Sequence, residues 1–374
     1  MNANKLIFAG LPMIAVTYGL SRFSYGLMLP YINETINMNQ TTSGVISSLS
    51  YVAYCIAIAA AMVFSHKVTS RVILIAAGLL SIIGLGAISI SMNPVVLGLG
   101  IFLAGMSTGL SSPPYADIVS KNVTSKVQNQ TNSWINSGTS IGTAFTGAVA
   151  MMMVDSWRIT YVIFMAIAVV VLVINYNVLP RHQTVEKKLP QDTIGNAGKQ
   201  SLQLISASLL LGLSCAAYWT FSRDFILSLE NVPAYLGDWL WIIIGLAGLL
   251  GGTAGVFINR FGIRHAFRIS AAAISTSSFL LGIYPGNAVI GFLSPFLFGS
   301  SYVFMTGVLI VWGVSVFRTN PSLGLGVPFL VLAFGQAAGS ILAGMTADLF
   351  GYQILFLAAS VIGYLSMVFQ YKTD

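Results

Sequence analysis

The sequence predicts an all-α integral membrane protein in which twelve transmembrane helices form two pseudo-symmetric six-helix bundles. Only 7% of its 374 residues are charged, whereas 56% are hydrophobic. A soluble chain carries about 25% charged residues, so the polar surface here is too small to cover a water-soluble globule. Two further observations support the prediction. Apolar runs of spanning length recur along the chain, and Lys and Arg are concentrated in alternate gaps between them.

Twelve apolar runs meet the length of about 20 residues that a helix needs to cross the hydrocarbon core. Met1–Lys5 is too short to form the charged region of a signal peptide with a cleavage site, so we interpret the first run as a span. The runs are 6–31, 42–64, 72–91, 94–116, 132–154, 158–179, 202–228, 235–258, 266–285, 288–315, 322–346 and 351–371.

The longest polar gap divides the chain near its middle. Residues 180–201 are predicted to be a linker between an N-terminal bundle of residues 1–179 and a C-terminal bundle of residues 202–374. Because one chain contains both bundles, we expect the protein to work as a monomer.

The distribution of basic residues predicts the orientation of the chain. One side has only Arg158, at the start of the sixth span, and Arg22 and Arg223 lie within spans. Because Lys and Arg favour cytoplasmic loops, both termini and the linker are predicted to face the cytoplasm of a plasma membrane, here a bacterial inner membrane. The scattered positive charge does not form the basic face of a nucleic-acid-binding protein. The other basic residues share the opposite side: Lys5, Lys67, Arg71, Lys121, Lys126, Arg181, Lys187, Lys188, Lys199, Arg260, Arg264, Arg268, Arg318 and Lys372.

The two halves repeat weakly, at offsets of 193–201 residues. The glycines of the fifth span recur in the eleventh with the same spacing, and Ser21–Arg22 recurs as Ser222–Arg223. Two parallel six-helix repeats are a known basis of alternating access, with the substrate near the membrane midplane. The matching glycines are Gly138, Gly142 and Gly147 in the first half and Gly335, Gly339 and Gly344 in the second.

Several short segments resemble motifs of one transporter family. Residues 255–264 (GVFINRFGIR) resemble the loop G-x-L-x-D-R-x-G-R-R, and residues 65–71 resemble a diverged copy. Residues 155–161 (DSWRITY) resemble G-W-R-x-x-F, with a partner at 348–352 (DLFGY). On these motifs the whole chain resembles the major facilitator superfamily of secondary transporters, nearest to bacterial drug- and metabolite-efflux branches. The resemblance implies alternating access without a cofactor, with a proton as the candidate coupling ion.

The chain also departs from the family pattern. The acidic residue of the loop motif is replaced by His66 in one half and by Asn259 in the other, and residues 138–142 (GTSIG) lack the usual proline. These departures argue against family-style proton-coupled drug antiport and leave the predicted fold unchanged.

Three ionisable residues lie well inside predicted spans: Arg22, Arg223 and Asp224. Because a charge in a span costs about 2.5–3.5 kcal/mol on insertion scales, such residues are expected to face a cavity or a partner. They are predicted to contact substrate or to form a gate. The alternative is a structural Arg–Asp pair whose arginine reaches the membrane surface. Two guanidiniums against one carboxylate predict a substrate with an anionic or zwitterionic group.

Aromatic and amide side chains complete the predicted substrate site. The aromatic residues flank the charges at helical spacing, which suits an apolar pocket with few polar groups. An interfacial aromatic belt is the alternative, and hydrogen bonds across helices explain the amides equally well. The residues are Tyr18, Tyr25, Tyr218, Trp219, Asn136 and Gln336.

The cytoplasmic loops contain candidate gating residues. Asp117 follows the helix-breaking pair Pro113–Pro114, and it is predicted to pair with Lys67 or Arg71, or else to be an ordinary surface acid. The corresponding loop of the second half contributes further gating candidates, which are Asn259, Arg260 and Arg264.

The remaining chemistry favours a carrier. No nucleophile–base constellation is visible, the three histidines lack metal-ligand spacing, and no GxxxxGK[ST] loop occurs, so neither an enzyme nor a direct ATPase is predicted. A channel would favour rings of repeated polar residues. We therefore expect a secondary transporter whose partners are a small-molecule substrate and the lipid bilayer. Export of a drug or metabolite is the leading prediction, and uptake of a small organic anion or zwitterion is the alternative.

Overall fold

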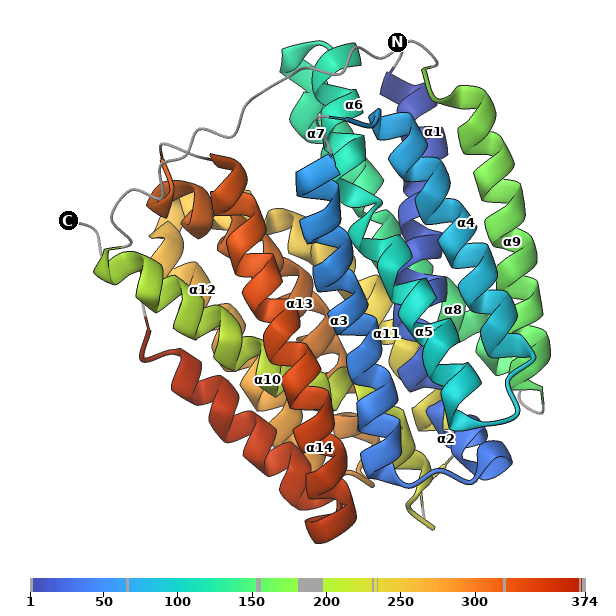
Figure 1. The fold of residues 1–374 in the computed structure, drawn as a ribbon. Helices are drawn as coiled ribbons and strands as arrows, with labels where there is room; N and C mark the ends of the chain where they lie inside the picture. Colours follow the sequence, from blue (N-terminus) through green and yellow to red (C-terminus); the bar gives the residue numbers. More distant parts are fainter. Residues whose placement is uncertain are drawn as a thin grey trace. The chain divides into compact units, whose positions relative to one another are not determined.

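The computed structural model describes residues 3–64, 67–152, 156–180, 198–230, 232–233, 235–318, 321–369 and 371. All regular secondary structure in these ranges is helical (Figure 1), which confirms the predicted all-α class. His66, His182 and most of the predicted linker lie outside the described residues.

The described part of the N-terminal half contains ten helical segments. The first predicted span comprises three of them, because a π-helix separates two α-helices. The segments are α1 (Ala3–Ile14), η1 (Ala15–Phe23), α2 (Ser24–Ile36), α3 (Gln40–Phe64), α4 (Ser70–Ser89), α5 (Pro94–Gly109), α6 (Ser112–Asn122), α7 (Ser125–Asn136), α8 (Gly138–Met152) and α9 (Trp157–Val178).

The C-terminal half contains fewer and longer segments. Two of its helices each contain one glycine with non-helical dihedral angles, at Gly262 and Gly351. The segments are α10 (Lys199–Leu227), α11 (Tyr235–Gly248), the 3₁₀-helix η2 (Leu249–Thr253), α12 (Ala254–Ile283), α13 (Ala288–Val316) and α14 (Pro321–Ser366).

The helices are consistent with twelve spans. In the described part of the chain, nine continuous helical stretches are long and apolar enough to cross a membrane. Two of them, Tyr235–Ile283 with 49 residues and Leu323–Ser366 with 44 residues, are each about twice the length that one crossing needs. Each contains two predicted spans, divided near Gly262 and Gly351. The fifth predicted span corresponds to α7 and α8, which are too polar or too short to be among the nine.

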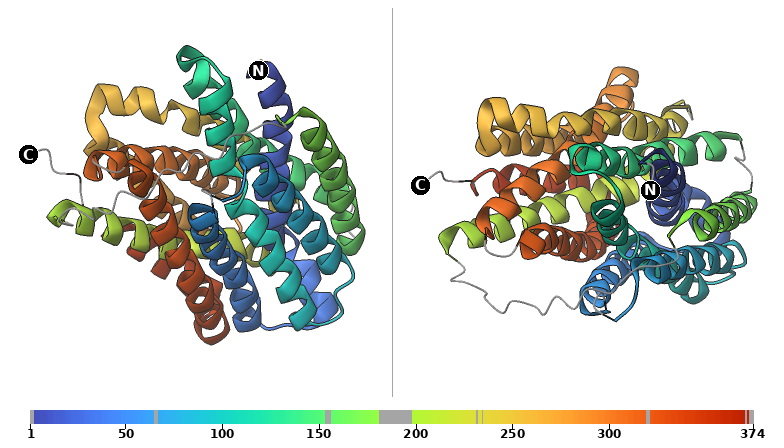
Figure 2. Two further views of the ribbon diagram at one scale, coloured as in Figure 1. Left: turned by 45° about the horizontal axis from the view of Figure 1, so that its top comes forward. Right: turned by 90° about the horizontal axis from the view of Figure 1, so that it is seen from above.

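The chain divides into two compact units. The first comprises Met1–Met38 and Leu49–Lys188, and the second comprises Asn39–Ser48 and Leu189–Asp374. In the first unit α4 packs against α5 and α9, and η1 packs against α8. In the second unit α10 packs against α14, and α13 packs against both α11 and α12 (Figure 2). The start of α3 therefore belongs to the second unit, whereas the rest of that helix belongs to the first.

Local sequence explains where several helices begin and end. The side chain of Asn93 accepts a hydrogen bond from Val96 N at 3.0 Å and precedes Pro94, a combination that favours a helix start. Helix α2 ends at Asn37, whose φ of 56° is the left-handed conformation typical of a helix C-terminus. Gly262 and Gly351 have φ of 82° and 81°, so a side chain at either position would strain the break in the helix.

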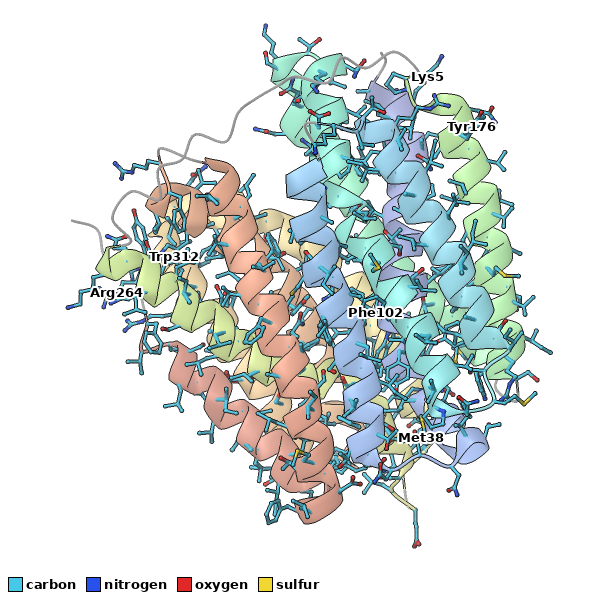
Figure 3. All side chains as sticks on the ribbon, in the orientation of Figure 1. Lys5, Met38, Phe102, Tyr176, Arg264 and Trp312 are labelled. Carbon is cyan, nitrogen blue, oxygen red and sulfur yellow. The ribbon has the colours of Figure 1, made fainter. Side chains whose placement is uncertain are left out.

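Within the first unit, the positions of the loops alternate as the predicted spans require. Figure 3 places Lys5 and Tyr176, which lie near the start of α1 and the end of α9, at one end of the unit. Met38, which follows α2, lies at the opposite end. The assignment of these ends to the two sides of the membrane stays a prediction.

Helix η1 approaches α8 closely enough that only glycine fits at the contact. A Cβ atom built on Gly19 would lie 2.3 Å from the carbonyl carbon of Gly142, which is backbone and cannot rotate away. Small residues that allow such backbone contact are typical of helix packing in membranes. The glycine repeat noted in the fifth span therefore fixes how η1 packs in the first unit.

Substitution of Gly19 by Ala is expected to lower the free energy of unfolding by about 1–3 kcal/mol, because the added methyl group must displace backbone. The matched control is Gly252→Ala, since a Cβ at Gly252 would have no neighbour within 4 Å. Melting temperatures of the purified variants test this. Equal melting temperatures for both would contradict the packing described here.

Candidate functional site

The π-helix η1 carries the charged part of the first span. A π-helix has wider turns than an α-helix, and short π segments are frequent at functional sites. The hydroxyl of Thr17 donates to Ser111 Oγ at 3.0 Å, and Thr108 donates to the carbonyl of Thr17 at 2.8 Å. These bonds tie η1 to the segment that joins α5 to α6, and they hold η1 where it presents Arg22.

Arg22 is buried among aromatic rings. Its side chain is only 8% exposed. The guanidinium carbon lies 4.4 Å from the ring centre of Tyr54, 4.8 Å from that of Tyr51 and 5.5 Å from that of Phe23. Ring faces attract a cation, and the attraction grows when water is excluded. The first unit therefore stabilises a charge inside a predicted span by cation–π contacts.

A chain of polar side chains leads from this arginine to α7. The hydroxyl of Tyr18 is hydrogen bonded to Tyr54 and to Ser112. Ser112 in turn donates to Asn136 Oδ1 at 2.8 Å. The structure thus brings together three predicted site residues, Arg22, Tyr18 and Asn136, within the first unit. Helices η1, α3, α6 and α7 each contribute to this polar chain.

Arg223 of the second unit has a carboxylate partner that the sequence did not identify. Its Nη2 atom lies 2.8 Å from Asp238 Oδ1, and the two side chains are 0% and 17% exposed. Asp238 lies in the first turn of α11, within the predicted span 235–258, but it was not among the three ionisable residues predicted to lie well inside the spans. The predicted count of two guanidiniums against one carboxylate was therefore wrong, because it omitted Asp238.

Asp224, the neighbour of Arg223, has a different partner. Its carboxylate accepts a short hydrogen bond from the hydroxyl of Tyr352 on α14. The two adjacent charged residues of α10 thus bind α11 and α14 respectively. This arrangement differs from the predicted structural alternative, because Arg223 is buried and pairs with Asp238, while Asp224 binds Tyr352.

The predicted aromatic residues are interior residues. Tyr25 is 3% exposed, Tyr218 is 0% exposed and Trp219 is 5% exposed. An interfacial belt requires side chains at the lipid surface, so the belt alternative was wrong for these three residues.

Tyr218, Trp219 and Gln336 belong to one cluster in the second unit. The hydroxyl of Tyr218 is 2.7 Å from Ser294 Oγ, and its ring stacks on Phe298 with centres 4.0 Å apart. Trp219 packs edge-on against Tyr302 at 5.2 Å. Gln336 donates to the hydroxyl of Tyr302 at 3.1 Å. Tyr302 therefore joins the aromatic and amide candidates, although no sequence pattern pointed to it.

Asp117 lies in the middle of α6 and is bound by two neighbours. It forms an ion pair with Lys121 at 2.9 Å, and Ser70 donates to its Oδ2 atom at 2.5 Å. Arg71 donates to the carbonyls of Leu179 and Tyr176 at the end of α9. Arg71 therefore stabilises a helix terminus, and Asp117 has a partner other than the two predicted from sequence.

The other predicted gating residues are exposed. Arg260 lies over the ring of Phe261, with 5.2 Å from its guanidinium carbon to the ring centre. Arg264 points outward at one end of the second unit (Figure 3). Lys67 and Asn259 are also exposed. Their assignment to a gate stays a prediction.

Sequence reasoning missed Tyr51 and Tyr54 of α3. Their spacing of one helical turn, in the YVAYC segment, was the available signal. Nothing in the sequence paired that segment with Arg22, because the contact depends on how α3 packs beside η1.

The buried pair of Arg223 and Asp238 makes a stability prediction. Asp238→Ala would leave Arg223 buried without this carboxylate, and breaking a buried pair costs about 3–5 kcal/mol. Asp117→Ala is the matched control, because the Asp117–Lys121 pair is 36% and 33% exposed and such pairs contribute about 0–1 kcal/mol.

Thermal unfolding of both variants provides the measurement. We expect a large loss of melting temperature for Asp238→Ala and a small one for Asp117→Ala. The double variant Arg223→Met with Asp238→Leu is expected to recover most of the loss, since it removes both charges. Equal losses for the two single variants would contradict the account.

Comparison with known proteins supplies the family context. The model of the Major Facilitator Superfamily matches residues 13–327. The crystal structure of the nucleoside transporter NupG is similar with a TM-score of 0.77 and 16% identity, covering 100% of both chains. A POT family transporter in complex with 5-aminolevulinic acid has a TM-score of 0.79 and 12% identity, covering 98% of this chain and 94% of that one.

A further similar structure is the xylose transporter XylE from E. coli in a partially occluded inward-open conformation. Its TM-score is 0.78 with 14% identity, and the match covers 98% of this chain and 96% of that chain. At these identities the likeness establishes the fold and leaves the substrate open. Together with the helices described above, these matches confirm the predicted fold of two six-helix halves.

Proposed function

The chain belongs to the major facilitator superfamily, and we propose that this secondary transporter of small molecules carries a compound with an anionic group that binds Arg22. The observation that supports the proposal is the placement of a guanidinium, 8% exposed, among ring faces in the first unit. Maintaining a charge there is costly, so a role in binding explains its presence.

The contacts of Arg22 favour a planar anion. Tyr51 and Tyr54 lie within 4.8 Å of the guanidinium carbon and contact the cation through their rings. The N–H donors of a guanidinium lie in its plane, at the edge of the group. Carboxylates and phosphates accept hydrogen bonds from that edge, often two at once. The substrate is accordingly a small organic molecule with a carboxylate or phosphate.

The direction of transport is proposed from the sequence motifs. Export of an amphipathic drug or metabolite is the leading proposal, since the chain as a whole looks nearest to drug- and metabolite-efflux branches. Uptake of a small organic anion or zwitterion is the alternative. It suits the same arginine, because binding at Arg22 does not depend on the side from which the substrate arrives.

Ligand-induced stabilisation tests the role of Arg22. We expect members of a panel of carboxylates and phosphates to raise the melting temperature of the native protein, because a ligand that binds only the folded state stabilises it. Loss of charge-assisted hydrogen bonds worth about 1.5–3 kcal/mol predicts that Arg22→Ala weakens this binding by about 10- to 100-fold.

Arg318→Ala is the matched control for this experiment. Arg318 is exposed, and its Nε donates to the nearby carbonyl of Ser315. The control is expected to bind anions as the native chain does. If lipophilic cations alone stabilise all three proteins, Arg22 has a structural role and the anion proposal is wrong.

Vesicles of defined orientation test the direction. Once the panel yields a ligand, we expect its accumulation in inside-out vesicles and its exclusion from right-side-out vesicles, since export from the cell corresponds to entry into an inverted vesicle. Accumulation in right-side-out vesicles would establish the uptake alternative instead. Saturable counterflow in either preparation distinguishes a carrier from a channel.

A further inference from the structure

The start of α3 is capped by a carboxylate from α14. Asp348 Oδ1 accepts a hydrogen bond from Gln40 N at 3.0 Å. Its Oδ2 accepts from Thr41 N at 2.7 Å and from Thr41 Oγ1 at 2.5 Å. The first N–H groups of a helix lack partners within it, and an acidic group there is stabilised by the helix dipole. One side chain thus binds three donors across more than 300 residues of sequence.

Helix α3 also has a cap of its own. The side chain of Asn39 accepts from Thr42 N at 2.9 Å, the usual position for a residue directly before a helix. Asn39 therefore accepts a hydrogen bond from the third backbone N–H of the helix, at Thr42, while Asp348 accepts from the first two, at Gln40 and Thr41. Because the local cap remains, release of Asp348 would detach the start of α3 from α14 without unwinding it.

The contact continues along a close backbone seam. A Cβ atom on Gly44 would lie 2.2 Å from the carbonyl oxygen of Ser340, and one on Gly344 would lie 2.3 Å from that of Gln40. Ser47 Oγ lies 2.8 Å from Thr220 Oγ1 of α10. Asp348, which is itself exposed, adds three hydrogen bonds to this seam of closely packed backbone and hydroxyls.

The same part of α14 reaches the charged residues of α10. Asp348 precedes Gly351, whose φ is 81°, and Tyr352 follows it. Tyr352 donates to Asp224, the neighbour of the Arg223 that pairs with Asp238. This short segment therefore links the start of α3 to the last turns of α10 and, through Arg223, to the first turn of α11, all within the second unit.

We propose that Asp348 is a gating residue of the transporter. Its carboxylate holds Asn39–Ser48 on the second unit in one state of the transport cycle and releases them in another. Helix α3 continues from this segment into the first unit, where it carries Tyr51 and Tyr54 beside Arg22. Asp348 thus acts through α3, as a positioning residue that does not touch the substrate. The proposal is independent of the anion proposed for Arg22.

Thiol accessibility of the capped segment tests the proposal without any substrate. Ser43 is fully buried in this segment, and Ser43→Cys places a thiol there. In a background with Cys55→Ala and Cys215→Ala, maleimide labelling of the detergent-purified protein reports how often the segment separates. Removal of three hydrogen bonds to a carboxylate is expected to speed labelling by at least about ten-fold in Asp348→Ala.

A graded series keeps the test decisive. Asp348→Asn retains one acceptor oxygen and is expected to label at an intermediate rate. Thr41→Val removes only the hydroxyl donor and is expected to label several-fold faster than the parent. This variant carries the test if Asp348→Ala does not fold. Labelling at the parent rate in both Asp348→Asn and Thr41→Val would overturn the proposal.

Two controls separate gating from general loosening. Glu230→Gln removes an exposed acid that follows α10, and it is expected to label at the parent rate. Val308→Ala creates a cavity in the buried part of α13 and lowers the melting temperature without touching the cap. Fast labelling in Val308→Ala, equal to that of Asp348→Ala, would mean that Asp348 contributes only stability and would also overturn the proposal.

Discussion

A charged side chain inside a hydrocarbon layer must be solvated by the protein itself, and the arrangement of polar groups in this transporter depends on that constraint. Arg22 is surrounded by the rings of Tyr51 and Tyr54, whereas Arg223 is paired with the carboxylate of Asp238. A charge left without such partners inside a span is costly. The constraint therefore ties each arginine to a particular set of neighbouring helices.

The two halves of the repeat satisfy this constraint differently. Ser21–Arg22 and Ser222–Arg223 occupy matching positions in the sequence, yet one arginine contacts ring faces and the other contacts a carboxylate. The carboxylate of Asp238 already balances the charge of Arg223. We therefore propose ligand binding at Arg22 in the first unit and a structural role for Arg223 in the second.

The features set by local composition could be predicted, and those set by packing could not. Apolar run length and the distribution of Lys and Arg were enough for the all-α membrane fold, and the loop motif at 255–264 led to the family that the comparison confirmed. Arg22 was a visible candidate because a charge in a span is rare. Its ring partners come from another helix, so their identity required the structure.

Asp238 and Asp348 are further residues whose partners could not be predicted from the sequence. Neither was predicted to be a site or gating residue, because sequence alone does not show which distant groups an acid contacts. The structure places Asp238 against Arg223 and Asp348 against the first turn of α3. Local structure follows short-range chemistry instead: Asn93 and Asn287 cap the starts of α5 and α13, and Gly262 and Gly351 mark breaks in α12 and α14.

The most direct measurement of the central claim uses a thiol that the chain already has. Cys55 is half-buried next to Tyr54 and interacts electrostatically with Arg22, whereas Cys215 is buried and serves as the internal control. The rate of Cys55 modification would be compared for a negatively charged and a positively charged methanethiosulfonate of similar size. The account predicts faster reaction with the anion, and loss of that preference in Arg22→Gln. Equal rates with both reagents in the native protein would contradict an anion-binding site at Arg22.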